Sequence, residues 1–118
     1  MKQQTQAQIR EHIKSDATVK TINTDKQERH ILNSGQYIQG RSYLFDGIDA
    51  QSLVDKYHGT GNIEVSISGT WKNKETVTVD EDIGEVIDPI TGERAVTNRI
   101  TIHYSKTGAH VVPTGRRI

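Results

Sequence analysis

The chain has 118 residues, of which 32% are hydrophobic and 25% charged, and its 15 basic residues balance 15 acidic ones. This length fits a single domain with a thin core. The sequence has no cysteine, which excludes disulfides, thiolate zinc sites and a cysteine nucleophile. No apolar run approaches the ~18 residues of a membrane span, and the polar start of the chain predicts no secretory signal.

Charge is distributed unevenly along the chain. Residues 76–90 carry five acidic side chains and no Lys or Arg, whereas residues 91–118 carry five basic side chains and one acidic side chain. Because local charge decides where an anion binds, the basic C-terminal stretch is the better place for an anionic ligand. The neutral total argues against broad, non-specific binding of nucleic acid.

Residues 1–23 are predicted to form an N-terminal helix or linker that precedes a domain of residues 24–118. The partial helical stripe in this segment consists of Ala7, Ile9, Ile13 and Ala17. Gln and Lys occupy most of the remaining positions, so the stripe is weak. The pattern therefore favours a segment that is detachable from the domain.

A second helix is predicted to begin near residue 50. Residues 22–45 before it have no clean periodicity, and their turn residues leave room for a short strand or a single helical turn. Asp46 or Asp49 can cap the first turn of the helix, and a glycine-containing turn ends it. The apolar face of this helix consists of Ala50, Leu53, Val54 and Tyr57.

From residue 62 onward the apolar period changes to two, which predicts strands. The strands are expected over residues 63–67, 76–80, 83–87, 97–105 and 109–114. Turn residues separate them, and the last two strands form a hairpin around residues 106–108. Helices in the first half followed by antiparallel strands in the second half predict an α+β fold.

The terminal hairpin is predicted to carry the chemistry. Alternation places Ile100, Ile102 and Tyr104 on the core face. The opposite, polar face consists of Thr97, Arg99, Thr101, His103 and Ser105. If Ser105 pairs with His110, then His110 and Thr114 join this polar face. A slip of one residue would disperse the cluster, so the prediction depends on the register.

A face of this kind has the groups that a metal-independent ribonuclease needs. Two histidines with pKa values near neutrality can act as base and acid in one cycle. The base takes the proton of the 2′-hydroxyl, the acid protonates the leaving 5′-oxygen, and a guanidinium stabilises the anionic phosphorane-like state. The alternative is a solvated sheet face whose histidines contact water. Zinc on His103 and His110 is disfavoured, because the hairpin has no carboxylate and no metal-binding spacing.

Several motifs occur in a fixed order along the chain. They are KQERHI at 26–31, Tyr37 with GRS at 40–42, DAQSLV at 49–54, GTG at 59–61, IHYSK at 102–106 and HVVP at 110–113. Their order and spacing resemble the polymorphic toxin type 50 domain over about residues 24–114. That domain ends bacterial polymorphic toxins and is also appended to phage minor head proteins. The resemblance implies a barnase-like ribonuclease fold, with N-terminal helices packed on an antiparallel sheet.

The hairpin face and the resemblance together name candidate site residues. The predicted catalytic residues are His30, His103, His110 and Ser105. The predicted substrate-binding residues are Tyr37, Arg41, Ser42, Arg99, Lys106 and Thr114. For His30, a buried histidine that holds a backbone carbonyl stays open as the alternative. The sole tryptophan, Trp71, is expected in the core or over a hairpin rather than under a base.

The resulting hypothesis is a metal-independent endoribonuclease toxin domain that cuts RNA, with tRNA among the candidate substrates, and that needs no cofactor. We expect it to act in the bacterial cytoplasm, with no membrane partner. An acidic immunity protein is expected to cover the basic C-terminal face. Two alternatives stay open. One is a non-catalytic phage accessory or virion-associated module that binds protein or DNA, with phage head proteins among its candidate partners. The other is a metal-dependent toxin that cuts DNA.

Overall fold

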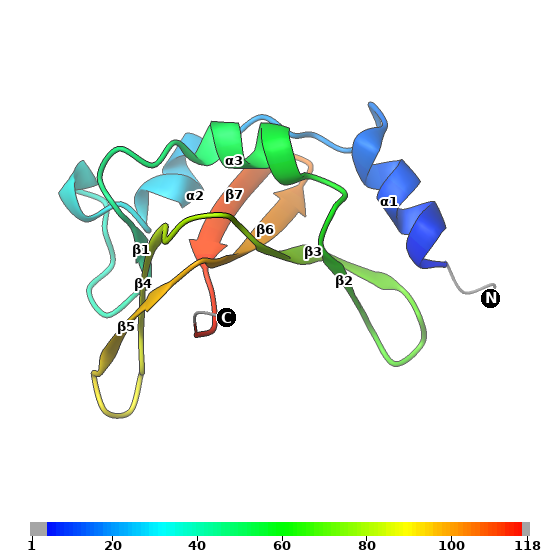
Figure 1. Cartoon of the computed structure of the whole chain (residues 1–118). Coiled ribbons are helices and arrows are strands. Elements are labelled where there is room, and N and C mark those ends of the chain that lie inside the picture. The colour runs from blue at the N-terminus through cyan, green and yellow to red at the C-terminus, as the bar shows by residue number, and fades with distance from the viewer. Residues whose placement is uncertain (1–4, 117–118) are drawn as a thin grey trace.

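A computed structural model describes residues 5–116 of the chain. Within this range, helices α1 (Gln6–Lys14), α2 (Thr24–Glu28) and α3 (Ala50–Tyr57) and the short 3-10 helix η1 (Leu32–Ser34) lie on one side of the strands (Figure 1). No helix in the described part is long and apolar enough to cross a membrane.

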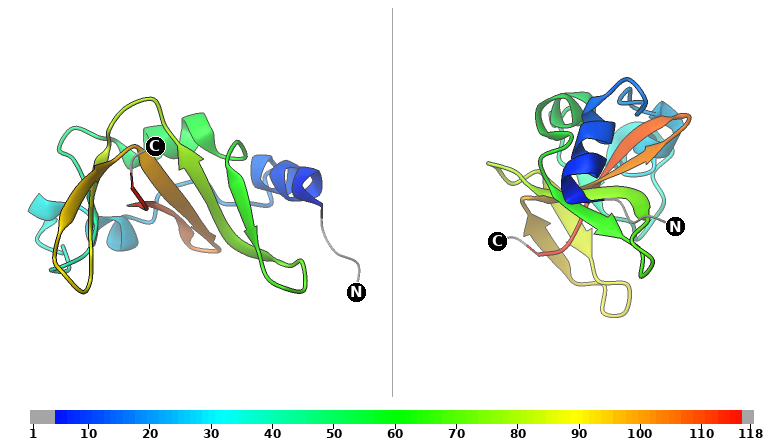
Figure 2. Two further views of the ribbon diagram at one scale, coloured as in Figure 1. Left: turned by 60° about the horizontal axis from the view of Figure 1, so that its bottom comes forward. Right: turned by 90° about the vertical axis from the view of Figure 1, so that its right-hand side faces the viewer.

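Two antiparallel sheets make up the second half of the fold. The strands are β1 (Tyr43–Leu44), β2 (Asn62–Val65), β3 (Trp71–Thr78), β4 (Gly84–Ile87), β5 (Arg94–Thr97), β6 (Arg99–Ser105) and β7 (Gly108–Pro113). The larger sheet has the order β2-β3-β6-β7 and the smaller one β1-β4-β5. This arrangement confirms the predicted α+β class, whereas the barnase-like topology stays a prediction. Helix α1 and the smaller sheet lie at opposite ends of the molecule (Figure 2).

Helix α3 forms where the sequence predicts it. Asp49, one of the two candidate caps, accepts a hydrogen bond from the backbone N–H of Gln51 at 3.0 Å. Three apolar residues of the helix, Ala50, Leu53 and Val54, are buried. The helix therefore packs on one face of the larger sheet, here called the inner face. Strands β6 and β7 run beneath the helix (Figure 1).

Helix α1 is packed into the core, which corrects the expectation of a detachable segment. Thr5 and Gln8 form a capping box at its start. Ile9 and Ile13 are both 0% exposed and belong to the same core cluster as the sheet residues. Two isoleucines four positions apart lie on one helix face, and burying each contributes about 1.5–3 kcal/mol. The predicted division between residues 23 and 24 stays a prediction.

The inner face of the larger sheet carries the apolar residues that alternation predicts. Ile100 and Ile102 are 0% exposed and Tyr104 is 6% exposed. Ala109 and Val111 of β7 are also 0% exposed. The opposite face, here called the outer face, is thereby left to the polar residues of the same strands.

The limits of the predicted strands differ in the structure, most clearly for β3, which begins at Trp71 and not near residue 76. The segment predicted as one strand over 97–105 is divided at Asn98 into β5 and β6, because β5 pairs with β4 in the smaller sheet and β6 pairs with β3. Thr97 is therefore fully buried against Gly84 instead of lying on the polar face. Ile67, predicted at the end of a strand, is fully exposed in the turn that follows β2.

The predicted register of the β6–β7 hairpin is wrong by two residues. Ser105 pairs with Gly108 instead of His110, because the turn contains only residues 106 and 107. Gly108 enters β7 at a φ of 127°, which side chains rarely adopt. A shift by two keeps every side chain on its predicted face. His103 consequently lies directly opposite His110.

Candidate active site

Three histidine rings are stacked at the outer face of the larger sheet. His103 on β6 and His110 on β7 are register partners, with ring centroids 4.6 Å apart and ring planes at 12°. His30, which follows α2, stacks on His110 with a centroid distance of 6.2 Å and an angle of 14°. We call these three residues the imidazole row. The structure thus brings together the three histidines that the sequence singles out, and their catalytic role stays a prediction.

A side chain from α2 fixes the position of His30 beside the sheet. The amide of Gln27 accepts from the backbone N–H of Val111 at 2.7 Å and donates to the Val111 carbonyl at 2.9 Å. It therefore pairs with the free edge of β7 as a neighbouring strand would. Gln27 is only 3% exposed, so this contact ties the end of α2 to β7 and holds the following turn over His110.

The tautomer of His30 is set by a backbone group. Its Nδ1 lies 2.8 Å from the carbonyl oxygen of Ser42. A carbonyl only accepts hydrogen bonds, so Nδ1 carries the proton and Nε2 of the neutral ring is the acceptor. His30 is 6% exposed, as in the open alternative of a buried histidine that holds a carbonyl, whereas His103 and His110 are half-buried.

The row is electrically neutral at physiological pH. Burial lowers the pKa of His103 to about 4 and that of His110 to about 4, and it also lowers the pKa of His30. Lys74 lowers the pKa of His103 further, and the neighbouring imidazole His103 does the same for His110. Because each protonated ring opposes protonation of the next, the row titrates as a coupled group. A bound phosphate anion would raise these pKa values and favour a protonated ring.

Several cations surround the row, and sequence reasoning missed most of them. Lys74 on β3 is the register partner of His103. Lys26, Arg29 and Arg41 are close enough to lower the pKa of one or more of the histidines. Of these four cations, only Arg41 was among the predicted site residues. Lys26 and Arg29 belong to the same KQERHI motif as His30, whereas the proximity of Lys74 to the row depends on the long-range pairing of β3 with β6.

Two predicted substrate contacts lie away from the row. Arg99 and Thr114 face each other at the far end of the β6–β7 pair, where the Thr114 N–H donates to the Arg99 carbonyl at 3.0 Å. Four strand positions separate Arg99 from His103, which is about 13 Å along β6. Thr101 lies between them on the outer face. The structure therefore does not bring Arg99 and Thr114 together with the imidazoles.

Two other predicted residues lie at the hairpin end and stabilise or border the turn. The hydroxyl of Ser105 donates to the Gly108 carbonyl at 2.9 Å, which holds the turn closed. Lys106 is exposed and lines a cavity on the helix side of the sheet. The predicted catalytic role of Ser105 stays a prediction, and the contact seen for its hydroxyl is a structural one.

The loop that carries Arg41 is held by its neighbours. The hydroxyl of Tyr37 donates to the carbonyl of Arg41, and its ring packs edge-on against Tyr43 at a centroid distance of 6.0 Å. The carbonyl of Ser42 orients His30. These contacts hold the backbone of the loop beside His30, whose pKa the exposed Arg41 lowers, while direct contact of these residues with a substrate stays a prediction.

Within residues 5–116, no group of three or more His, Asp or Glu side chains is arranged to hold a metal ion. The row instead has parallel rings, next to the cations that an anionic substrate requires. Two half-buried imidazoles side by side can exchange protons with a bound substrate. The chemistry that this arrangement supports is acid–base catalysis on an anion.

Comparison with known proteins identifies a family. A family model described as bacterial toxin 50 matches residues 22–113. The match covers the whole imidazole row and Lys74, begins after α1 and confirms the resemblance inferred from the motifs. No curated protein matches the chain.

Proposed function

The chain belongs to the bacterial toxin 50 family, and from this premise we propose that it is a metal-independent endoribonuclease. The observation that carries the proposal is the imidazole row, in which two half-buried rings lie 4.6 Å apart beside a lysine. Acid–base cleavage of RNA needs two proton-transferring groups and a cation within reach of one phosphate, and the outer face provides them.

The proposed step transfers the phosphoryl group within the substrate. One imidazole takes the proton of the 2′-hydroxyl as the 2′-oxygen forms its bond to phosphorus. The bond from phosphorus to the 5′-oxygen breaks, and a second, protonated imidazole gives its proton to that oxygen. The products are a 2′,3′-cyclic phosphate end and a 5′-hydroxyl end. Each positioned acid or base contributes about 10²–10⁴-fold to the rate.

Burial divides the roles within the row. His103 and His110 are half-buried and can contact the substrate, whereas His30 is 6% exposed and reaches it through His110. We therefore assign the base and the acid to His103 and His110, and a positioning role to His30. Lys74 lies beside His103 and stabilises the negative charge that develops on the phosphate oxygens.

The proposal also concerns partners and place of action. Lys26, Arg29, Arg41 and Lys74 give the surroundings of the row a positive potential, which suits an acidic immunity protein that blocks substrate access. RNA is the proposed substrate, and the bacterial cytoplasm is the proposed place of action. A non-catalytic phage module is the rival function, and the experiment below separates the two.

The test is incubation of the purified chain with total RNA in EDTA. We expect fragments with cyclic phosphate and 5′-hydroxyl ends, and their loss in His103→Ala and His110→Ala. The matched control is His58→Ala, because the His58 ring contacts the Val54 carbonyl of α3 and does not belong to the row. Intact RNA with the folded wild-type chain would contradict the proposal and favour the non-catalytic module. Cleavage that EDTA abolishes would contradict the metal-independent mechanism.

A further inference from the structure

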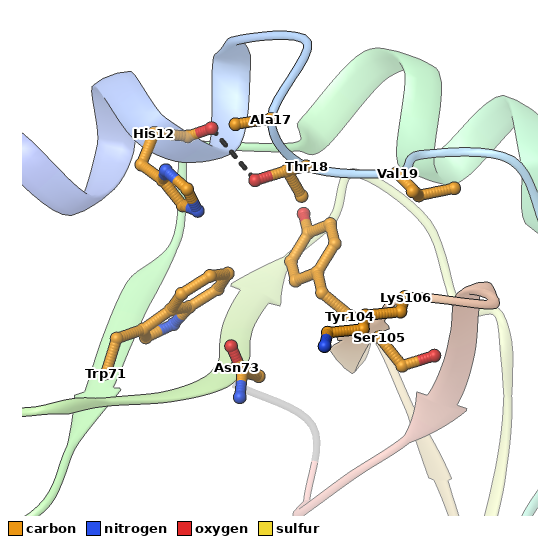
Figure 3. A pocket seen from close by; sticks show the side chains of 9 residues that line it. All are labelled: His12, Ala17, Thr18, Val19, Trp71, Asn73, Tyr104, Ser105 and Lys106. Carbon is orange, nitrogen blue, oxygen red and sulfur yellow. Dashed lines mark hydrogen bonds between the residues drawn. The ribbon is translucent and has the colours of Figure 1, made fainter.

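A cavity of about 530 Å³ lies on the helix side of the larger sheet, near the hairpin end of β6. Its wall combines α1 and the loop after it with the ends of β3 and β6 (Figure 3). The side chains that line it include His12, Trp71, Asn73, Tyr104 and Lys106. This volume lies within the ~300–1,000 Å³ of typical ligand pockets.

Aromatic rings form one wall of this cavity. The indole of Trp71 lies 5.9 Å from the ring of His12 in an edge-on arrangement and 5.6 Å from the ring of Tyr104. The indole N–H donates to the Lys74 carbonyl at 3.0 Å, and the Tyr104 hydroxyl donates to Glu75. These polar atoms are already paired, and Tyr104 is 6% exposed, so it is the half-buried Trp71 that offers a ligand the apolar surface of its ring. A flat, aromatic ligand fits such a wall.

Polar groups stand at the rim of the same cavity. The side chains of Asn73 and Lys106 are both exposed and point toward the space beside Tyr104 (Figure 3). An amide can exchange hydrogen bonds with the edge of a base, and an ammonium group pairs with phosphate. An aromatic wall combined with an amide and an ammonium group matches a nucleotide unit better than it matches a purely apolar ligand.

The cavity and the imidazole row lie back to back on the same strands. Tyr104, in the cavity, follows His103, in the row, and Lys74, whose carbonyl holds Trp71, is the register partner of His103. Only about 7 Å of strand separates His103 from Ser105 at the hairpin end. A single strand that leaves the row can therefore pass around this end, beside Lys106, and enter the cavity.

We propose that this cavity binds one nucleobase of single-stranded RNA, in a nucleotide that flanks the phosphate held at the imidazole row. The base stacks against Trp71, which the edge-on ring of His12 holds in place. The edge of the base meets Asn73, and Lys106 contacts the connecting phosphate. The inference rests on the proposed function for the identity of the substrate. A duplex cannot supply this contact, because its bases are already stacked, so the cavity selects single-stranded segments.

The test uses Trp71 as its own reporter, because it is the only tryptophan in the chain. A short single-stranded RNA oligonucleotide is titrated into His110→Ala, which leaves the RNA uncut, and tryptophan fluorescence is recorded. We expect saturable quenching, and an affinity about tenfold weaker when His12→Ala or Lys106→Ala is added. Lys56→Ala is the matched control, because Lys56 is an exposed lysine of α3 that pairs with Asp80.

The outcomes separate this proposal from the function on which it rests. Normal cleavage by the wild-type chain without quenching, or with an affinity that His12→Ala and Lys106→Ala leave unchanged, overturns the cavity proposal alone. Equal quenching by a duplex of the same sequence also overturns it, because base stacking is then not the contact. Quenching that depends on His12 and Lys106 supports the cavity even if the wild-type chain leaves RNA uncut.

Discussion

Lys74 on β3 and His103 on β6 are register partners, so an ammonium group and an imidazole are neighbours on the outer face. After burial, Lys74 is the largest cause of the lowered pKa of His103. The same ammonium group is placed to contact a phosphate bound at the row. In the proposed mechanism, this one side chain adds to the effect of burial on the neighbouring ring in the free protein and stabilises the substrate anion in the complex.

Replacing this lysine should affect titration and catalysis together. In Lys74→Gln, the pKa of His103 is expected to rise from about 4, because a nearby positive charge has been removed. The value of kcat/KM for RNA is expected to fall about 10²-fold, the usual cost of one stabilising contact to a developing anion. NMR titration of the histidine ring protons and cleavage assays measure the two effects.

Lys72→Gln is the matched control for Lys74→Gln. Lys72 lies on the same strand and is exposed, so its replacement by glutamine removes the same formal charge at a neighbouring position. If the two variants lower kcat/KM equally, the effect of Lys74 is general electrostatic attraction rather than contact with the phosphate.

Stability should increase with pH between about 4 and 6.5. His103 and His110 have pKa values of about 4 in the folded chain, below the ordinary histidine value of 6.5. In that window the unfolded chain binds more protons than the folded chain, so the free energy of unfolding falls as pH decreases. The stabilisation that depends on both rings being neutral is complete above pH 6.5 and is lost as the pH falls toward 4.

Urea unfolding at pH 4.5, 5.5 and 7 checks this expectation. The variant His103→Gln/His110→Gln should flatten the pH dependence, because glutamine does not titrate. Phosphate should reduce the loss of stability at low pH, since an anion at the row favours the protonated rings. A pH dependence identical in the wild-type chain and the double variant would show that other groups are responsible.

The two faces of the terminal hairpin could be predicted from sequence, because a register error of two residues leaves each side chain on the same face of the sheet. The predicted pairing of Ser105 with His110 is off by two, yet His103 and His110 remain on one face and Ile102 on the other. Local chemistry was equally informative at the start of α3, where Asp49 caps the helix. Short-range periodicity and capping therefore predicted α3 and the histidine face.

Long-range pairing accounts for what the sequence could not predict. Gln27 pairs with Val111 across 84 positions, and this contact brings His30 to the row. The position of Lys74 beside His103 depends on the register between β3 and β6. In the sequence, Ile9 and Ile13 form only a weak apolar stripe, and their burial depends on the distant core residues that they contact. In each case the informative partner lies on a distant segment.

A buried carboxylate joins the turn after α3 to the sheet. Glu75 is 0% exposed and accepts from the N–H groups of Gly59 at 2.8 Å and Gly61 at 3.0 Å, and from the Tyr104 hydroxyl. Glu75→Leu should lower the free energy of unfolding by about 3–5 kcal/mol, because it leaves three buried donors without an acceptor.

Tyr104→Phe is the milder companion to Glu75→Leu. It removes one hydrogen bond and leaves the carboxylate its two backbone donors, so a loss of about 1–2 kcal/mol is expected. Urea unfolding at pH 7 measures both variants. Losses of equal size would mean that the two glycine N–H groups contribute little and that the carboxylate serves mainly to pair Tyr104.

The positioning role of His30 can be separated from direct catalysis by two substitutions. His30→Ala removes the ring that stacks on His110, and kcat is expected to fall about 10²-fold because His110 is no longer held in place. His30→Phe keeps an aromatic ring on His110 but has no nitrogen, so kcat should stay within about tenfold of the wild-type value. Single-turnover cleavage of a defined RNA measures both rates, and circular dichroism checks folding, since His30→Phe also leaves the Ser42 carbonyl without its donor. If His30→Phe is as inactive as His30→Ala while remaining folded, stacking on His110 is not the contribution of His30, and its ring nitrogens are required for cleavage.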